Sequence, residues 1–309
     1  MTLRLALDAM ATRFELVLRG DDAVRLRAAG EEAFAEIRRL EAQLSFYRPE
    51  SEVSRINARA AWAPVRVEPR LFRLLERAAR LHALTGGAFD PTVGPLMRAW
   101  GFTGGGGRVP DEETLAEARR RTGMRRVRLD AETYTVAFEW PGMSLDLGGI
   151  GKGYAIDEAV LVLKEAGVGH ALLHGGTSTA YAFGRPREAE AWKVAVPAPG
   201  DAGGDDLLAV ATLRDEALSV SVVSGKAFEA EGRAFGHVLD PRSGRPVEGA
   251  FLAAVATGSA TDADALSTAL LVLGPPAVDR LTDAFDGLRA LVVSPSPEGF
   301  EVTRTGFTD

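Results

Sequence analysis

The chain has 309 residues, of which 46% are hydrophobic, a content typical of packed globular proteins. Its 43 acidic and 36 basic residues give a net charge of -7. No basic cluster is long enough to follow a phosphate backbone, so we expect no nucleic acid as partner. The chain has no cysteine, which excludes disulfides, thiolate nucleophiles, iron–sulfur clusters and cysteine-ligated zinc. Any metal must therefore be held by oxygen or histidine ligands.

The first residues do not have the pattern of a signal peptide. Asp8, Arg13 and Glu15 interrupt the apolar stretch that a signal peptide needs. No later segment is long and apolar enough to span a bilayer. We therefore expect a cytoplasmic protein without a transmembrane segment, and a periplasmic location only if a leader has been removed.

The first part of the chain shows one extended and two helical patterns. Residues 10–19 alternate like a strand, and residues 22–45 space their apolar side chains as an amphipathic helix does. The same helical spacing predicts a second helix over 69–84, which a Thr-Gly-Gly sequence ends. A turn-rich segment at 89–95 comes next.

The middle of the chain favours a helix followed by short strands. Pro110 and Asp111 are typical of a helix start. Beyond this helix, apolar and β-branched residues predict strands at 125–129, 134–138 and 143–147.

The second half mixes turns, strands and two further helices. The glycine-rich segment 146–153 precedes a helix predicted over 154–166, and a strand is predicted at 170–174. A polar, glycine-rich stretch at 197–206 is typical of a surface loop. The last clear helix is predicted over 262–273.

The segment from Asp146 to Gly153 carries four glycines between an apolar strand and a helix. Backbone amides there can approach an anion at a helix N-terminus, and Lys152 adds a positive charge. It is not a P-loop, because Gly153 rather than serine or threonine follows Lys152. A tight strand-to-helix turn without any ligand explains the same glycines.

A second cluster begins the last helix. Asp264 and Thr268 are four residues apart and share one helix face, with Ser267 beside them. Such oxygens are suitable ligands for Mg²⁺. The alternative is a capping box, in which Thr261 and Asp264 satisfy amides at the helix start without any metal.

Two further features carry side chains suited to a binding site. His237 lies in an apolar, strand-like run that leads into an Asp-Pro turn at Asp240, where a histidine can act as a general base or contact a phosphate. A histidine that only packs in the core is the alternative. Tyr47 and Phe89 are aromatic residues in loop-like settings and can stack on a flat heterocycle, although core packing also explains them.

Taken together and in their order along the chain, the motifs of this sequence resemble those of the FAD:protein FMN transferases, often called ApbE-like proteins. The resemblance spans almost the whole chain and includes Met10-Ala-Thr, SFYRPESEVSRIN, GGAFDPTVGPL, SLDLGGIGKGYAID, ALLHGGTS, SGKAFEAEGRAFGHVLDPRSGRP and ATDADALSTALLVLG. It implies an α+β fold with mixed, largely antiparallel sheets flanked by helices, a T-fold-like catalytic domain. A single such domain is expected over residues 1–309.

The resemblance also implies roles for individual residues. FAD would be the substrate, held by Met10, Tyr47, Ala88, Phe89, Asp90, Gly148, Lys152, Tyr154, His237, Val238 and Leu239. Mg²⁺, with Mn²⁺ as the alternative, would be held by Asp264, Thr268, the carbonyl of Gly151 and Ser267. His237 would be the catalytic histidine near the scissile phosphate, with Asp240 as a nearby carboxylate.

The implied reaction moves the FMN half of FAD onto a protein. A threonine or serine hydroxyl of a client flavoprotein, in a segment rich in Asp, Ser, Gly and Thr, would attack the phosphorus on the FMN side, and AMP would leave. Two alternatives remain, a pyrophosphatase that splits FAD with water and a noncatalytic FAD-binding protein.

The chain departs from the family pattern at several positions. Thr177 stands where family members usually carry Asp or Asn, and Gly151 replaces the usual alanine. Lys226 follows a Ser-Gly pair, so the aromatic residue of that segment, Phe228, is displaced. We expect these changes to affect efficiency and client choice more than flavin binding.

Overall fold

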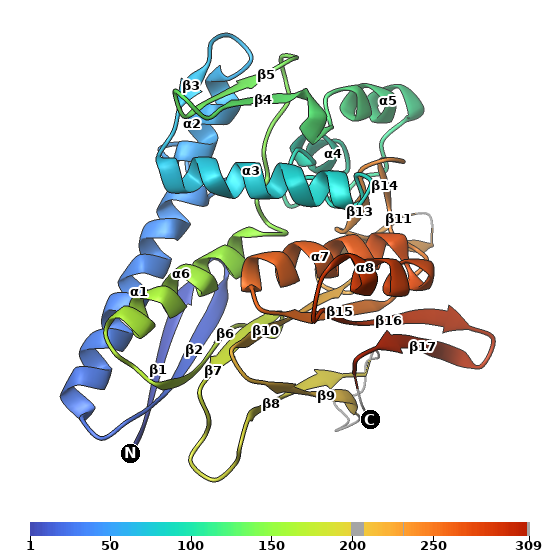
Figure 1. Cartoon of the computed structure of the whole chain (residues 1–309). Helices are drawn as coiled ribbons and strands as arrows, with labels where there is room; N and C mark the ends of the chain where they lie inside the picture. Colours follow the sequence, from blue (N-terminus) through green and yellow to red (C-terminus); the bar gives the residue numbers. More distant parts are fainter. Residues whose placement is uncertain (199–206, 231, 308–309) are drawn as a thin grey trace.

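The computed structural model describes residues 1–198, 207–230 and 232–307. Its centre is an eight-stranded sheet in which every neighbouring pair of strands is antiparallel (Figure 1). In spatial order the strands are β1 (Thr2–Ala9), β2 (Thr12–Arg19), β6 (His170–Gly175), β7 (Thr179–Phe183), β10 (Glu216–Val222), β15 (Leu252–Thr257), β16 (Arg289–Ser296) and β17 (Gly299–Thr305).

One face of this sheet carries the main core. Alternate residues of β2 point into it, and Phe14, Leu16 and Leu18 are fully buried there. The helices that cover this face are α1 (Ala23–Leu44), α6 (Gly151–Glu165) and α7 (Ala260–Leu273), with α8 (Val278–Ala284) beside α7. In Figure 1, α6 and α7 lie above the sheet and α1 lies to the left of β1 and β2. No helix in the described ranges is long and apolar enough to cross a membrane.

The opposite face of the sheet is covered by the hairpin of β8 (Trp192–Pro197) and β9 (Leu207–Leu213), below the sheet in Figure 1. Trp192 and Val196 of this hairpin pack in a second core against Leu252 and Leu291 of the central strands. Because both faces of β15 are buried, its sequence is a continuous apolar run rather than an alternating one.

The remaining elements form a smaller layer beyond α7. Helix α3 (Pro69–Leu84) lies next to a three-stranded sheet, and further short elements flank them (Figure 1). These elements are α2 (Glu52–Arg59), β3 (Val65–Arg66), α4 (Gly94–Ala99), α5 (Glu112–Arg120), η1 (Met124–Arg126), β4 (Val127–Asp130), β5 (Thr135–Phe138), β11 (Ala227–Ala230), β12 (Arg233–Gly236), β13 (Leu239–Asp240) and β14 (Arg245–Pro246). The short helix η2 (Pro275–Ala277) instead links α7 to α8 and contacts β16.

The α+β class and most helices follow the prediction. Helix α1 lies within residues 22–45, and the Asp22 carboxylate caps it by accepting from the amides of Val24 and Arg25. Helix α3 has the predicted bounds. Helices α6 and α7 begin three and two residues earlier than predicted, at Gly151 and Ala260.

The predicted strand at 143–147 is wrong, and strand β1 was missed. The backbone of Leu145 is bonded by a side chain instead of a neighbouring strand: its amide donates to Asn57 Oδ1 at 2.7 Å and its carbonyl accepts from Asn57 Nδ2 at 2.9 Å. The segment is therefore extended without belonging to a sheet. The predicted loop at 197–206 lies mostly outside the described residues.

Candidate active site

A cavity of about 770 Å³ lies where the first turn of α6, the middle of α7 and several loops meet. The structure brings to its wall most of the residues that the sequence singled out, from segments far apart in the chain. These lining residues are Met10, Tyr47, Ala88, Phe89, Asp90, Gly148, Gly151, Lys152, His237, Val238, Leu239, Asp264 and Thr268.

Three predicted site residues do not line this cavity. Tyr154 is buried in α6, and this burial raises the pKa of its phenol. Asp240 forms a bidentate ion pair with Arg242, with distances of 2.8 and 2.9 Å. Ser267 is fully buried behind the wall, where its hydroxyl donates to the Asp264 carbonyl at 3.0 Å.

The glycine-rich turn allows α6 to lie directly against α7. A Cβ atom on Gly153 would lie 2.1 Å from the Ala260 carbonyl oxygen and 2.8 Å from the Asp264 Cβ, distances that real side chains do not tolerate. The Gly153 amide donates to the Asp264 carboxylate at 3.0 Å. The glycine-rich segment therefore positions the Asp264 carboxylate in addition to exposing its own backbone amides.

The capping-box alternative for α7 is wrong. The residue that caps this helix is Ser259, whose hydroxyl accepts from the amide of Asp262 at 3.3 Å. Thr261 lies inside the helix and donates its hydroxyl to Asp157 at 2.6 Å. The Asp264 side chain accepts from α6 instead of from its own helix start, so capping does not account for it.

Asp264 has the character of a cation ligand. It is buried, with 4% of its surface exposed, yet within the described ranges it forms no ion pair. Burial raises the pKa of its carboxyl, while the charge of Lys152 and the Gly153 amide act in the opposite direction. A buried carboxylate without a cation is costly, and a bound metal ion removes that cost.

The surrounding donor set fits Mg²⁺ rather than a metal that needs several charged ligands. No group of three or more histidine, aspartate or glutamate side chains gathers as a metal site in the described part of the chain. Thr268 lines the same wall, and its hydroxyl donates to the Asp264 carbonyl at 3.1 Å. One carboxylate with neutral oxygens is sufficient for Mg²⁺, which commonly completes its octahedron with water and substrate phosphates.

Two lysines make the cavity suitable for phosphate. Lys152 donates to the Ser178 hydroxyl at 2.7 Å and has no carboxylate partner among the described residues. Lys226 also lines the wall, although the sequence had marked it only as a departure from the family pattern. Its position after the Ser-Gly pair was the signal that could have indicated this role.

The sequence predicted His237 on a strand, but the residue lies in the short link between β12 and β13. Its Nδ1 lies 3.1 Å from the Lys226 carbonyl oxygen and 3.3 Å from the Lys226 amide nitrogen. Burial lowers the pKa of the imidazole; the hydrogen bond with the Lys226 backbone acts in the opposite direction, and the charges of Lys226 and Lys152 lower the pKa further. The ring is therefore neutral at neutral pH, and Nε2 is the nitrogen left for the cavity.

The two aromatic residues singled out in the sequence have different environments. Tyr47 is 61% exposed and makes an edge-to-face contact with Phe46, with ring centroids 5.4 Å apart. Phe89 is 3% exposed, packs in the main core and also lines the cavity. Of the two rings, Tyr47 is thus the more accessible to a planar ligand.

Comparisons with known proteins identify chains that are similar to this one over most of its length. A model of the ApbE family matches residues 10–292. The chain is 35% identical over 286 residues to a FAD:protein FMN transferase of Treponema pallidum, covering 88% of this chain and 79% of that protein. It is 32% identical over 253 residues to the protein of the same name from Haemophilus influenzae, covering 79% and 72%.

Solved structures show the same architecture. The ApbE protein of Thermotoga maritima superposes with a TM-score of 0.89 at 29% identity, covering 99% of this chain and 97% of that chain. The flavinyl transferase ApbE of Pseudomonas stutzeri gives a TM-score of 0.87 at 30% identity, with coverage of 99% and 95%.

Proposed function

Because the chain belongs to the ApbE family, we propose that it is a FAD:protein FMN transferase, which moves the FMN half of FAD onto a threonine or serine hydroxyl of a client flavoprotein and releases AMP. One observation carries this proposal. A single cavity combines an exposed aromatic ring, two lysines, a buried carboxylate that forms no ion pair among the described residues, and a histidine whose pKa burial lowers.

The cavity offers separate surfaces for the parts of FAD. The ring of Tyr47 can stack on a planar heterocycle, because it is exposed and lines the cavity. Lys152, Lys226 and the amides of the glycine-rich turn can neutralise the pyrophosphate.

Asp264, Thr268 and the carbonyl of Gly151 are the groups that would hold Mg²⁺. When bound, this ion withdraws negative charge from the phosphates and makes the phosphorus a better electrophile. Ser267 supports the site from behind, since it hydrogen-bonds the Asp264 carbonyl and does not reach the cavity.

His237 is the group that would take the proton from the acceptor hydroxyl. If Nδ1–H donates to the Lys226 carbonyl, Nε2 carries the free lone pair. The client oxygen then forms a bond to the phosphorus on the FMN side, the bond from that phosphorus to the AMP oxygen breaks, and the hydroxyl proton passes to Nε2. The products are a phosphoester-linked FMN and AMP.

The test mixes the enzyme, FAD and Mg²⁺ with a flavin-domain protein encoded beside this chain's gene, and follows covalent flavin fluorescence on the client together with AMP. The client's acceptor threonine replaced by valine is the control that should not be labelled. AMP formed at the same rate without any client would identify a pyrophosphatase and contradict the transfer proposal.

A metal-site variant completes the test. Asp264→Asn should abolish the response of labelling to Mg²⁺. Asp262 lies on the same helix, α7, but pairs with Arg77 of α3, so Asp262→Asn should leave the response intact. Equal labelling by Asp264→Asn and wild type, with or without Mg²⁺, would contradict the proposed metal ligands.

A further inference from the structure

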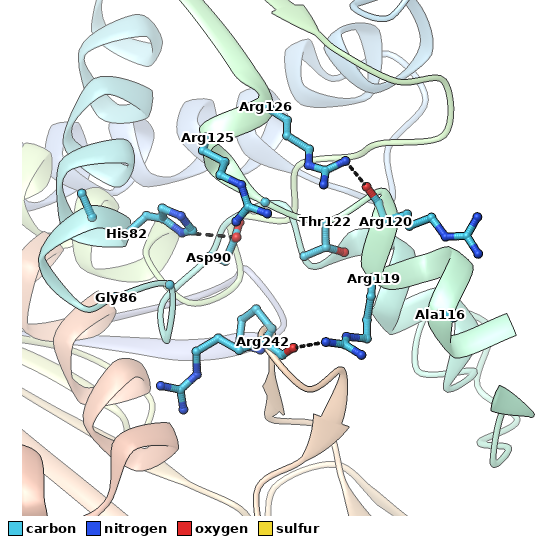
Figure 2. Close-up of a pocket in the computed structure, with 14 residues that line it drawn as sticks. His82, Gly86, Asp90, Ala116, Arg119, Arg120, Thr122, Arg125, Arg126 and Arg242 are labelled. Atoms are coloured by element: carbon cyan, nitrogen blue, oxygen red, sulfur yellow. Dashed lines mark hydrogen bonds and ion pairs between the residues drawn. The ribbon is translucent and has the colours of Figure 1, made fainter. Parts of the chain in front are cut away.

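A second cavity, of about 570 Å³, adjoins the first and shares with it only Asp90 and Pro241 among the described lining residues. Figure 2 shows that arginines dominate its wall. They are Arg119, Arg120, Arg125, Arg126 and Arg242. The proposed transfer reaction uses none of them.

Two of these arginines are explained by their neighbours in the protein. Arg120, in the last turn of α5, pairs with Glu117 at 3.5 Å, and such a charge also stabilises a helix C-terminus. Arg242 pairs with Asp240 at 2.8 Å. Glu117 also pairs with Arg121, at 2.7 Å, so Arg120 shares its carboxylate while Arg242 has one of its own.

The other three arginines have no carboxylate partner among the described residues. Arg119 donates to the Arg242 carbonyl at 2.7 Å, and Arg126 donates to the Arg120 carbonyl at 2.6 Å. These acceptors orient the guanidinium groups without neutralising them. Arg125 has no hydrogen bond or ion pair within the described ranges, and its charge acts on His82.

The carboxylate on this wall, Asp90, is already engaged. It is 6% exposed and accepts from the amide and hydroxyl of Thr92 at 2.8 and 2.5 Å and from the amide of Met124 at 3.2 Å. His82 Nδ1 lies 3.2 Å from Asp90 Oδ2. Asp90 forms no ion pair with any of the three arginines among the described residues, and its single negative charge cannot balance three guanidinium groups.

The rest of the wall indicates the size and class of the ligand. Among the described residues that line it, the one aromatic ring is the imidazole of His82, whose Nδ1 faces Asp90 and the Phe89 carbonyl, and none is a large aliphatic, so the wall is strongly polar. Guanidinium groups bind phosphate and carboxylate through paired hydrogen bonds. We propose that this cavity binds a compact polyanion with at least two phosphate or carboxylate groups, at a site separate from the flavin cavity.

Isothermal titration calorimetry with inorganic pyrophosphate and with citrate tests this proposal. The protein is saturated with FAD and kept in EDTA, so that neither the flavin cavity nor a metal ion competes for the probe. One saturable site is expected for at least one probe, and the preferred probe assigns phosphate or carboxylate chemistry. Arg119→Gln and Arg125→Gln should each weaken binding about tenfold or more.

Two control variants decide where the probe binds. Arg128→Gln removes an exposed arginine of β4 close to η1 but outside the cavity, and it should leave the dissociation constant unchanged. Lys152→Gln should also leave it unchanged. Unchanged FAD affinity and thermal unfolding would show that the Arg119 and Arg125 variants are folded.

Three results would overturn the proposal: no saturable binding of either probe, binding unaffected by both cavity variants, or binding lost in Lys152→Gln, which would place the anion in the flavin cavity. None of these measurements depends on flavin transfer, so failure here is distinct from failure of the proposed function.

Discussion

The amide of Gly153 donates a 3.0 Å hydrogen bond to the carboxylate of Asp264, which joins the first turn of α6 to α7. The contact needs the two helices to touch, and only glycine allows that at position 153. The glycine-rich turn and the last helix are therefore two halves of one structural unit, and the proposed metal ligands depend on their contact.

We expect Gly153→Ala to destabilise the protein by about 1–3 kcal/mol, because the new methyl group would overlap the Ala260 carbonyl and force the helices apart. Mg²⁺-dependent transfer should weaken at the same time. Urea unfolding measures the first effect. Gly169→Ala is the matched control, since a Cβ there meets nothing within 4 Å. Equal stability of the two variants would contradict the packing argument.

We expect the transfer rate to fall in acid through the protonation of His237. Its pKa is lowered from 6.5, mainly by burial, so the neutral base is present at neutral pH and is lost only as the pH falls below about 6.5. The pH profile of transfer at saturating FAD measures this limb. His237→Gln should be slower by roughly 10²–10⁴-fold and should lack the limb. An unchanged limb in the variant would assign it to another group.

The pair of His82 and Asp90 should make stability depend on pH in the opposite direction. Burial by itself lowers the pKa of His82, but the hydrogen bond and charge of Asp90 outweigh it and raise the pKa above 6.5. A raised pKa in the folded state adds stability that is complete below pH 6.5 and is lost as the pH rises through the folded pKa.

Urea unfolding from pH 5.5 to 9 measures this contribution. The stability advantage of wild type over His82→Asn should shrink as the pH rises, by roughly 1.4 kcal/mol for each unit of pKa elevation. His174→Asn, which removes a more exposed histidine next to Glu15, serves as control. Parallel pH profiles for wild type and His82→Asn would rule out the predicted linkage.

Tyr47 should contribute to FAD affinity through its ring and not through its hydroxyl. Tyr47→Ala is expected to weaken FAD binding roughly tenfold, the value of one aromatic stacking contact, while Tyr47→Phe should bind as wild type does. Flavin fluorescence titration measures both. Trp62→Ala removes an exposed ring away from the cavity and should have no effect. A similar loss in the phenylalanine variant would instead implicate the hydroxyl.

The sequence by itself determined the features that depend on neighbours close in the chain. Helices α1 and α3 were found with bounds within a residue of those observed, because their apolar periodicity and their end signals are local. The order of the motifs indicated the family, and most of the site residues predicted from those motifs line one cavity.

Only the tertiary structure decided the roles that depend on distant partners. The local pattern around Thr261 matched a capping box, but the groups that bind Thr261 and Asp264 belong to α6, more than 100 residues earlier. The apolar residues around Leu145 predicted a strand. The backbone amide and carbonyl of Leu145 instead hydrogen-bond to the side chain of Asn57, 88 residues away. A hydrogen bond between such segments forms only after the chain has folded, so no local pattern could reveal it.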